Sequence, residues 1–504
     1  MGLYDCSIYG LIRRNGRTYH GENALTIGGQ RLTHRGLLES VDRLSAGLMT
    51  LGVKKGDRVC ILGKNSLEYV YLYGAAARLG AVLVPVNWRL KPEEIAYVIS
   101  DTTPAILFAD PEFQSMAGEL LAAAGSPAIP FSMGPGAGPF KPFADLMKQE
   151  WSGAAPDVSS DDDYVIIHTA AVHGKPRGAV LSQRNLLITG LQLAWRWGLN
   201  EQDVNLVALP LFHVAGSLLM VAAMTAGASN VLLPSFDVQA ALDHVVQDKV
   251  TMFGEFPPML KSLMDKAAEK GETMSTFRHV LGLDQPDTVN AFQEMTGGTF
   301  WAIYGQTETG GLVTTAPYTE RLGSAGKAFP LAEVAIEDDQ GNILPPGKSG
   351  EIVVQGPMVF RGYWNLPADT QHTFRHSRHH TGDRGRFDED GYLWFEGRAP
   401  EKELIKPGGE NVYPAEVESA ILEHTAVKEA CVIGVPDSHW GEAIKAVCSL
   451  KPGAALEGAE LIEFVASRIA RFKKPKHVVF VPELPKKPDG TVDREKVKAD
   501  HGKV

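Results

Sequence analysis

Residues 380–418 have the sequence HTGDRGRFDEDGYLWFEGRAPEKELIKPGGENVYPAEVE, and this stretch predicts where the chain divides into two domains. Its first part contains Asp390-Gly391 between short segments rich in aromatic residues, a pattern typical of a β-hairpin. Its last part contains Pro414 followed by carboxylates, which favour the first turn of a helix. Between them lie a charged run, Glu401-Lys402-Glu403, and a glycine pair, Gly408-Gly409. We interpret this segment as a hinge between two domains.

The chain before residue 160 alternates between helix-like and strand-like segments. Thr33 is a candidate N-cap of one helix, and residues 58–62 and 80–87 have the composition of buried strands. This alternation predicts a parallel sheet covered by helices. Hairpin turns between Arg321 and Trp364 predict a small antiparallel barrel.

Residues 166–180, IIHTAAVHGKPRGAV, predict a strand, a glycine-containing loop and a second strand. Backbone N–H groups of such a loop, together with Lys175, can approach a polyphosphate. The loop is not a Walker A motif, because the first glycine is absent and Pro176 stands where Ser or Thr would follow the lysine. Taken alone, the segment is better explained as a plain strand-turn-strand with a solvated lysine.

The stretch at residues 380–418 resembles the core signature of the adenylate-forming enzymes, a superfamily of acyl-CoA synthetases, aryl-CoA ligases, luciferases and peptide-synthetase adenylation domains. Further segments are similar to other motifs of this family in the same order, so the resemblance covers nearly the whole chain. It implies an α/β fold in which residues 1–401 form a large N-terminal domain of two doubly wound sheets plus a small β-barrel. This domain would hold the ATP and acyl sites. Residues 402–504 would form a small, mobile α+β C-terminal domain hinged to it.

The resemblance implies that the loop at residues 166–180 binds the phosphates of ATP. Thr169, Gly174 and Lys175 match the family's phosphate loop, and Arg177 keeps a positive charge. Residues 170–173, AAVH, depart from the usual run of Ser, Thr and Gly. This departure removes most of the hydroxyl groups expected to contact the pyrophosphate.

Residues 304–310, YGQTETG, closely match the family's YGxTE motif. A carboxylate that attacks the α-phosphate requires neutralisation of both the incoming anion and the departing pyrophosphate. The resemblance implies that Glu308 holds Mg²⁺, which prefers hard oxygen ligands, that Thr307 donates to the α-phosphate and that Tyr304 stacks on adenine. Thr307 and Glu308 are therefore candidate catalytic residues. A helix N-terminus capped by threonine would explain only Thr307.

The other nucleotide contacts implied by the resemblance come from three segments. Asp383 would accept both ribose hydroxyls, and Arg398 would reach the ribose or the phosphates. The adenine contacts match the family's glycine-rich strand end only in part. These candidate nucleotide-binding residues are Gly282, Leu283, Asp284, Gly305, Gln306, Asp383 and Arg398.

The segment LPLFHVAG, residues 209–216, resembles the family's aromatic segment beside the acyl pocket. A single histidine after an apolar run is more often a core residue than a catalyst. We therefore expect His213 to form a wall or gate of the acyl pocket, which it would share with Gly305, without transferring a proton.

The C-terminal part supplies the candidate CoA site. Paired glycines would let the backbone approach the thin pantetheine chain, although they also suit a simple turn. The basic run at residues 471–476 would contact the CoA phosphates, although such runs are usually solvated. Lys406 is a candidate catalytic residue for thioester formation. The candidate CoA-binding residues are Gly408, Gly409, Trp440, Arg471 and Lys473.

Two positions bear on how the reaction would proceed. Lys402 best matches the family's hinge residue, and Glu401 is the alternative. Thr491, in LPKKPDGTVDR at residues 484–494, stands where the family's adenylation lysine lies. Because threonine cannot supply that charge, either Lys486, Lys487 or another cation replaces it, or adenylation is slow.

His372, His376, His379 and His380 lie close together just before Thr381. A metal site is one interpretation, since His372 and His376 have helical spacing. However, no HExxH motif or cysteine ligand accompanies them. We therefore expect a solvated loop.

The composition excludes several classes of function. With 504 residues, 44% of them hydrophobic and 22% charged, the chain suits a globular protein of at least two domains. The net charge of −11 argues against a nucleic-acid partner, which requires a surplus of Lys and Arg. The cysteines show no CxxC spacing, so neither a zinc–thiolate site nor disulfides are expected; they are Cys6, Cys60, Cys431 and Cys448.

The N-terminal sequence lacks the apolar segment of a secretion signal. The longest uncharged run, residues 214–235, is interrupted by Gly, Asn and Pro, which predicts a buried helix followed by a buried strand. We expect a cytoplasmic protein without a transmembrane segment. Its oligomeric state is open, and a homodimer is one alternative.

The leading hypothesis is an ATP-dependent acid:CoA ligase with ATP, Mg²⁺ and CoA as cosubstrates or cofactors and a small carboxylic acid as substrate. A second hypothesis keeps the fold but transfers the acyl group to a carrier protein. A third, motivated by Thr491 and the altered phosphate loop, is a catalytically impaired protein that binds nucleotide or acyl-CoA. The sequence does not indicate the chain length or the aromatic character of the acid.

Overall fold

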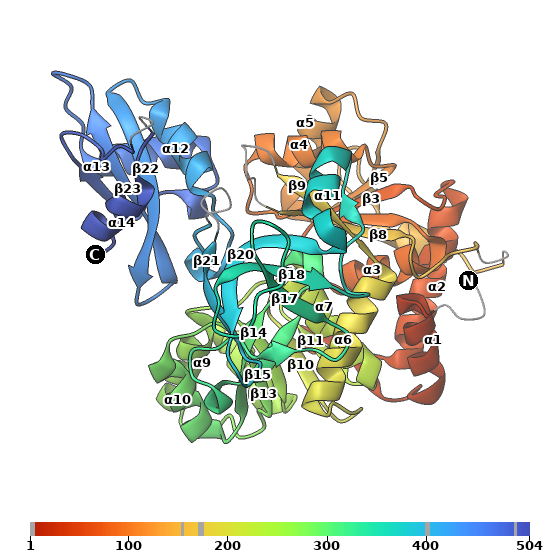
Figure 1. The fold of residues 1–504 in the computed structure, drawn as a ribbon. Coiled ribbons are helices and arrows are strands. Elements are labelled where there is room, and N and C mark those ends of the chain that lie inside the picture. The colour runs from red at the N-terminus through yellow and green to blue at the C-terminus, as the bar shows by residue number, and fades with distance from the viewer. Residues whose placement is uncertain (1–5, 153–155, 170–175, 399–403, 488–490, 504) are drawn as a thin grey trace.

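The computed structural model of the chain describes residues 6–152, 156–169, 176–398, 404–487 and 491–503. It has α/β architecture, with a large N-terminal domain and a separate small C-terminal domain (Figure 1). The predicted boundary between residues 401 and 402, and with it both hinge candidates, lies outside the described residues. The α/β class predicted from the alternating pattern is confirmed.

The first sheet of the N-terminal domain has eight strands in the order β19-β9-β8-β4-β3-β5-β6-β7. In this order, each strand from β8 through β4, β3, β5 and β6 to β7 pairs in parallel with the next. At the other edge, β9 pairs antiparallel with β8, and β19 pairs antiparallel with β9. Strands β3, β4 and β5 are almost wholly buried, as expected for strands covered on both faces. The strands are β3 (Arg58–Leu62), β4 (Val82–Pro85), β5 (Ile106–Ala109), β6 (Ile129–Ser132), β7 (Lys141–Pro142), β8 (Asp163–Thr169), β9 (Arg177–Ser182) and β19 (Gly362–Tyr363).

The second sheet has nine strands in the order β16-β15-β14-β13-β12-β10-β11-β1-β2. Its central strands β12, β13 and β14 run parallel, so their carboxyl ends meet at one edge, where ligands commonly bind in α/β sheets. The strands are β1 (Asn23–Ile27), β2 (Gln30–Thr33), β10 (Val204–Val207), β11 (Ser229–Leu232), β12 (Met252–Glu255), β13 (His279–Gly282), β14 (Thr299–Tyr304), β15 (Thr314–Pro317) and β16 (Lys327–Ala328).

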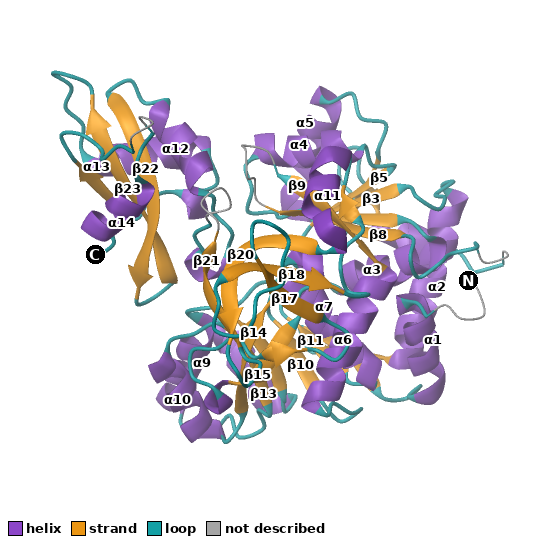
Figure 2. Cartoon of the chain, in the orientation of Figure 1, coloured by secondary structure: helices purple, strands orange, loops and turns teal. Residues whose placement is uncertain are grey.

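Helices pack against both sheets (Figure 2). The hydroxyl of Thr33 accepts the backbone N–H of Gly36 at the start of α2, so the predicted N-cap is confirmed. The run at residues 214–235 forms α7 and the buried strand β11, as predicted. The helices of this domain are α1 (Ile8–Thr18), α2 (His34–Thr50), α3 (Leu67–Leu79), α4 (Pro92–Thr102), α5 (Gln114–Ala123), α6 (Gln183–Trp197), α7 (Val214–Ala226), α8 (Val238–Gln247), α9 (Met259–Lys270), α10 (Pro286–Thr296) and α11 (Pro367–Thr373).

A four-stranded antiparallel sheet, β17-β18-β20-β21, occupies the region where the small barrel was expected. Gly391, with φ 79°, turns the predicted hairpin between β20 and β21, which is confirmed. His379 and His380 are 1% and 2% exposed in β20, so the expected solvated loop is wrong for these two residues. The strands are β17 (Glu333–Glu337), β18 (Gly350–Gln355), β20 (His379–Phe387) and β21 (Leu393–Arg398).

The C-terminal domain packs helices against a three-stranded sheet, β22-β23-β24. Its first helix begins at Pro414, as the sequence predicts. Its elements are α12 (Pro414–Leu422), β22 (Val427–Asp437), β23 (Gly441–Leu450), α13 (Gly458–Arg468), β24 (His477–Phe480) and α14 (Arg494–His501).

Within the described residues, every helix is either too short or too polar to cross a membrane.

Candidate active site

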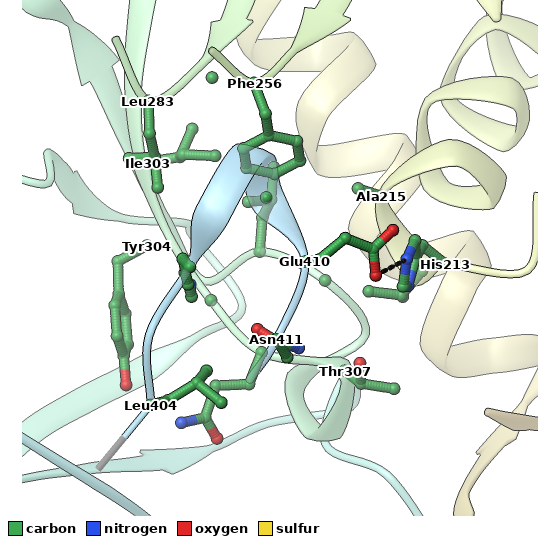
Figure 3. Close-up of a pocket in the computed structure, with 18 of the residues that line it drawn as sticks. His213, Ala215, Phe256, Leu283, Ile303, Tyr304, Thr307, Leu404, Glu410 and Asn411 are labelled. Carbon is green, nitrogen blue, oxygen red and sulfur yellow. Dashed lines mark ion pairs between the residues drawn. The ribbon is translucent and has the colours of Figure 1, made fainter. Parts of the chain in front are cut away.

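A cavity of about 880 Å³ is lined by residues of both domains (Figure 3). Most of the candidate residues from the sequence lie in its wall. Gly174, Lys175 and Lys402 fall outside the described residues. The lining includes Thr169, His213, Gly282, Leu283, Asp284, Tyr304, Gly305, Gln306, Thr307, Glu308, Asp383, Arg398, Lys406, Gly408 and Gly409.

The YGQTETG segment forms a tight turn at the carboxyl end of β14. The backbone N–H of Gln306 donates to Thr309 Oγ1 at 2.9 Å, and the short 3₁₀ helix Thr307–Thr309 follows. A Cβ at Gly305 would lie 2.1 Å from the Gly311 carbonyl oxygen, so only glycine fits this turn. The turn places Thr307 and Glu308 in the cavity wall.

The Glu308 carboxylate is 8% exposed, and Tyr363 fixes its orientation. The Tyr363 hydroxyl donates to Glu308 Oε1 at 2.9 Å. The Arg177 guanidinium lies over the Tyr363 ring, 4.2 Å from its centre. Arg177, at the start of β9, is therefore joined to Glu308 through one aromatic side chain.

Asp383 is the centre of a buried hydrogen-bond network. The Tyr304 hydroxyl and the Gln306 amide donate to Asp383 Oδ2 at 2.8 and 2.7 Å. Arg398 Nε lies 3.1 Å from Asp383 Oδ1. Burial and the Asp383 charge raise the pKa of Tyr304 well above its usual range, so this hydroxyl remains a donor. The network holds the Asp383 carboxylate firmly at the cavity wall.

Two carboxyl groups lie together where the adenine contacts were expected. Gly282 ends β13, and a Cβ at this position would lie 2.3 Å from Glu255 Oε1. Burial, and then the nearby Asp284, raise the pKa of Glu255 well above its usual range. Burial also raises the pKa of Asp284. Burial thus disfavours the charged form of both carboxyl groups at this end of the cavity.

Lys406 enters the cavity wall from the C-terminal domain. Its backbone N–H donates to Glu442 Oε2 at 2.7 Å. Burial, and then the positive charge of Arg398, lower the pKa of Lys406 to about 8, against the opposing effect of Asp383 and Glu442. A lysine with this pKa is partly neutral near physiological pH.

Glu410 of the C-terminal domain contacts the N-terminal wall of the cavity beside His213 (Figure 3). Its carboxylate forms an ion pair with Arg89, and His213 Nε2 lies 3.5 Å from its Oε2. The Asn87 amide lies 3.4 Å from the same oxygen. Burial alone would raise the pKa of Glu410, but His213 and Arg89 lower it to about 2. His213 thus lies in the cavity wall and also contacts the second domain.

The glycine pair lets this loop of the C-terminal domain fit between two aromatic rings. Gly408 and Gly409 have φ of 58° and 84°, a region that other residues rarely adopt. A Cβ at Gly408 would lie 2.8 Å from Trp440 Cε3, and one at Gly409 would lie 2.6 Å from Phe256 Cγ. Trp440 is thereby placed beside the glycine pair, although it is not in the cavity wall.

The residues of the predicted basic run at 471–476 differ in their exposure to solvent. The Arg471 side chain is 70% exposed and lies 3.8 Å from a Glu463 oxygen. Lys473 is 4% exposed, and its ammonium contacts both Glu94 of the N-terminal domain and, at 2.6 Å, Glu416. Lys473 therefore bridges the two domains in this arrangement.

Thr491 is exposed, and it is not among the described residues that line the cavity. Lys486, one of the candidate replacements for the missing lysine, forms an ion pair with Glu429 within the C-terminal domain. Lys498 of α14 does line the cavity, and the sequence analysis did not single it out.

Several groups around the cavity were missed from the sequence: Arg89, Glu255, Tyr363, Glu410 and Lys498. Glu410 could have been predicted from the sequence. It directly follows the glycine pair, so if that pair lies at the site, Glu410 must lie there too. The others lie in segments that give no local signal of a site.

Comparison with known proteins adds an independent line of evidence. The family model described as AMP-binding enzyme matches residues 12–364, and the model for the AMP-binding enzyme C-terminal domain matches residues 416–491. Indoleacetate–CoA ligase of Aromatoleum aromaticum is 34% identical over 95% of both chains. A fatty acid–[acyl-carrier-protein] ligase of Streptomyces coeruleorubidus is 30% identical over 94% of this chain and 92% of its own.

A solved structure shows the same similarity in three dimensions. It is a double mutant of o-succinylbenzoate CoA synthetase from Bacillus subtilis, bound with its product analogue. The TM-score is 0.83 at 29% identity, over 97% of this chain and 98% of the other.

Proposed function

The chain belongs to the adenylate-forming family of AMP-binding enzymes, and from this premise we propose that it is an ATP-dependent acid:CoA ligase. Such an enzyme converts a carboxylic acid into an acyl-AMP and then transfers the acyl group to CoA. One observation carries the proposal: a single cavity combines the Thr307–Glu308 turn and Asp383 of one domain with Lys406 of the other.

In the first step, an oxygen of the acid attacks the α-phosphorus of ATP, and the bond to pyrophosphate breaks. We assign Thr307 as a donor to the α-phosphate and Asp383 as the acceptor for the ribose hydroxyls. Glu308 is the residue that would hold Mg²⁺, since its carboxylate lines the cavity and supplies hard oxygen atoms. When bound, this ion neutralises charge on the phosphates.

In the second step, the CoA thiol gives its proton to the neutral amine of Lys406. The thiolate attacks the acyl carbonyl carbon, and the carbon–oxygen bond to AMP breaks. A general base works best when its pKa is near the operating pH, and the pKa of Lys406 is lowered to about 8. A thiol has an ordinary pKa of roughly 8.5, so this proton transfer is nearly balanced.

The acid itself would be apolar. The cavity wall contains many aliphatic and aromatic side chains, which favour burial of an apolar acyl group. They include Leu209, Leu218, Leu219, Phe236, Phe256, Met259, Leu281 and Phe300.

The test is mass spectrometry of the purified protein with MgATP, CoA and a mixed pool of aliphatic and aromatic acids. Acyl-CoA formed together with an equal amount of AMP is the expected result, and its mass identifies the acid. Ligand binding without AMP or any acyl product across the pool would overturn the proposal and favour a non-catalytic binding protein.

The similarity to a carrier-protein ligase supports one alternative acceptor. The same assay with a phosphopantetheinylated carrier protein in place of CoA distinguishes the two. Loading of the carrier at a rate at least tenfold above that with CoA would replace CoA as the proposed acceptor.

A further inference from the structure

Three potential metal ligands converge on the four-stranded sheet. Glu337 lies at the end of β17, His376 lies in the short 3₁₀ helix Arg375–Ser377, and His380 lies in β20. His376 Nδ1 is 2.6 Å from Glu337 Oε1, and His380 Nε2 is 3.4 Å from the same oxygen. The three ligand atoms lie within 4.8 Å of one another. Glu337 is 1% exposed, so a carboxylate has been buried here beside two imidazoles.

We propose that Glu337, His376 and His380 bind a divalent transition-metal ion, with Zn²⁺ as the best fit. Two imidazole nitrogens and one carboxylate oxygen form a donor set that suits zinc with a fourth position left for water. Magnesium and calcium prefer oxygen ligands alone, so this donor set discriminates against them.

Glu351 orients His380 for this role. Its Oε2 lies 2.9 Å from His380 Nδ1, so that nitrogen carries the hydrogen and Nε2 faces Glu337. A carboxylate behind a metal-binding imidazole is the usual second layer of a zinc site. With Nε2 directed at a carboxylate oxygen, either a second proton or a metal cation must lie between the two atoms.

The backbone conformation around His376 directs its side chain toward Glu337. His376 and Ser377 have φ of 53° and 59°, which is unfavourable for residues with a Cβ. A Cβ at Gly341 would lie 2.8 Å from His376 Cε1, so the glycine leaves room for the ring. The His376 side chain is 46% exposed, which gives an ion access from solvent.

The separation of each histidine from Glu337 is close to that in a zinc site, and the two histidine nitrogens lie within 4.8 Å of each other. Ligands around a tetrahedral zinc ion with bonds of about 2.0–2.1 Å lie roughly 3.3 Å apart. The separation of His380 and Glu337 already fits. His376 would have to withdraw from Glu337 by about 0.7 Å, starting from 2.6 Å, as its hydrogen is displaced by the ion. Its exposed position allows this movement.

Two arginines lie close to the carboxylates of this cluster. Arg378 lies 3.6 Å from Glu337 Oε2, and Arg375 lies 2.8 Å from Glu351 Oε2. They partly neutralise the two carboxylates, which moderates the affinity for a cation. The other oxygen of Glu351, Oε1, accepts the backbone N–H of Gly382 at 2.8 Å, which holds this carboxylate behind His380.

The test uses the full-length protein, stripped with a chelator, desalted and titrated with Zn²⁺ alone in the absence of nucleotide. We expect one zinc ion per chain to remain after gel filtration, measured by elemental mass spectrometry. His376→Ala and Glu337→Gln should each lose this ion. Glu351→Gln should weaken binding about 10- to 100-fold. His372→Ala is the matched control, since His372 is an exposed histidine of the same segment outside the cluster, and it should keep the ion.

Two outcomes would overturn the proposal. One is retention of less than a fifth of an equivalent by the wild-type protein, which would leave a protonated histidine–carboxylate network as the explanation of the cluster. The other is equal loss of zinc in His372→Ala and His376→Ala. Because His376 is exposed, its alanine variant should fold even if Glu337→Gln does not, and circular dichroism checks this.

Discussion

Lys406 and Lys473 both lie where the C-terminal domain meets the N-terminal domain, yet their surroundings shift their pKa in opposite directions. Burial and then Arg398 lower the pKa of Lys406, which lines the cavity, to about 8. Burial would lower the pKa of Lys473 too, but Glu416 and Glu94 outweigh it and raise that pKa.

The comparison shows that contacts with carboxylates, not burial alone, decide what a lysine at this interface can do. A lysine with a lowered pKa can exchange a proton with a bound thiol. A lysine held between two carboxylates stays charged, so it can form ion pairs but cannot accept a proton. On this basis, we propose that Lys406 takes part in the chemistry and that Lys473 joins the domains.

Lys406→Arg should produce the largest effect. Arginine keeps the positive charge but does not lose its proton, so the CoA-dependent step should slow by about 10²- to 10⁴-fold. Formation of acyl-AMP should change little. Single-turnover kinetics starting from acyl-AMP measure the step directly, with Lys473→Arg as the control that alters the other interface lysine. Equal rates in wild type and Lys406→Arg would remove the distinction between the two lysines.

The pH dependence sharpens the same distinction. Lys406 is active when unprotonated, and its lowered pKa is about 8. The rate of the CoA-dependent step should therefore fall as the pH drops below 8, by roughly 50-fold between pH 8 and pH 6, and level off above it. In Lys406→Arg the slower remaining rate should follow the ionisation of the CoA thiol itself, whose ordinary pKa is roughly 8.5. An inflection near pH 6.5 that survives in Lys406→Arg would point to a histidine instead.

Lys473→Met should weaken the docking of the C-terminal domain. Methionine leaves the Glu94 and Glu416 carboxylates without their shared cation, at a cost of about 2 kcal/mol, or roughly 30-fold. We expect the KM for CoA to rise while acyl-AMP formation is unaffected. Adding Glu94→Gln should restore part of the loss, since one unpaired charge is removed. No recovery in the double variant would argue against the bridge.

Gly409→Ala should have the smallest effect of the four. Its φ of 84° is strained for alanine, and the added Cβ would contact Phe256 across the interface, so we expect about a tenfold slower CoA-dependent step. Gly453→Ala is the matched control: its φ is 76°, but a Cβ there would meet nothing within 4 Å. Both variants introduce the same kind of backbone strain, so the difference between their CoA-dependent rates reports the contact of the new Cβ with Phe256. Equal rates in the two variants would assign the effect to backbone strain alone.

The sequence predicted the N-terminal wall of the cavity well. Thr307, Glu308 and Asp383 lie in contiguous motifs, and each motif fixes its own turn or strand end. The parallel pairing of β13 and β14 brings the strand ends at Gly282 and Tyr304 to one edge, and hydrogen bonds from Tyr304 and Gln306 hold Asp383 of β20 beside them. The chemical roles of these residues stay predictions that the experiments above address.

The contacts between domains could not be predicted. Lys473 appeared to belong to a basic run, but its partner Glu94 is 379 residues away in the sequence. Arg89 and Glu410 are 321 residues apart. The expectation of a solvated loop failed for His379 and His380 for the same reason, since Glu337 and Glu351 come from strands that local patterns do not pair with His380.

Glu351 also has a thermodynamic consequence. One of its oxygens meets His380, and the other accepts the backbone N–H of Gly382 at 2.8 Å, next to Asp383. A single carboxylate thus connects the proposed zinc site with the proposed nucleotide site. If zinc tightens the hold on a nucleotide at Asp383 by some factor, the nucleotide must tighten the hold on zinc by the same factor, since linkage is reciprocal. The concentration of metal in the cell would then influence how much of this protein binds nucleotide. The concentration of adenine nucleotide would likewise influence how much of it binds metal.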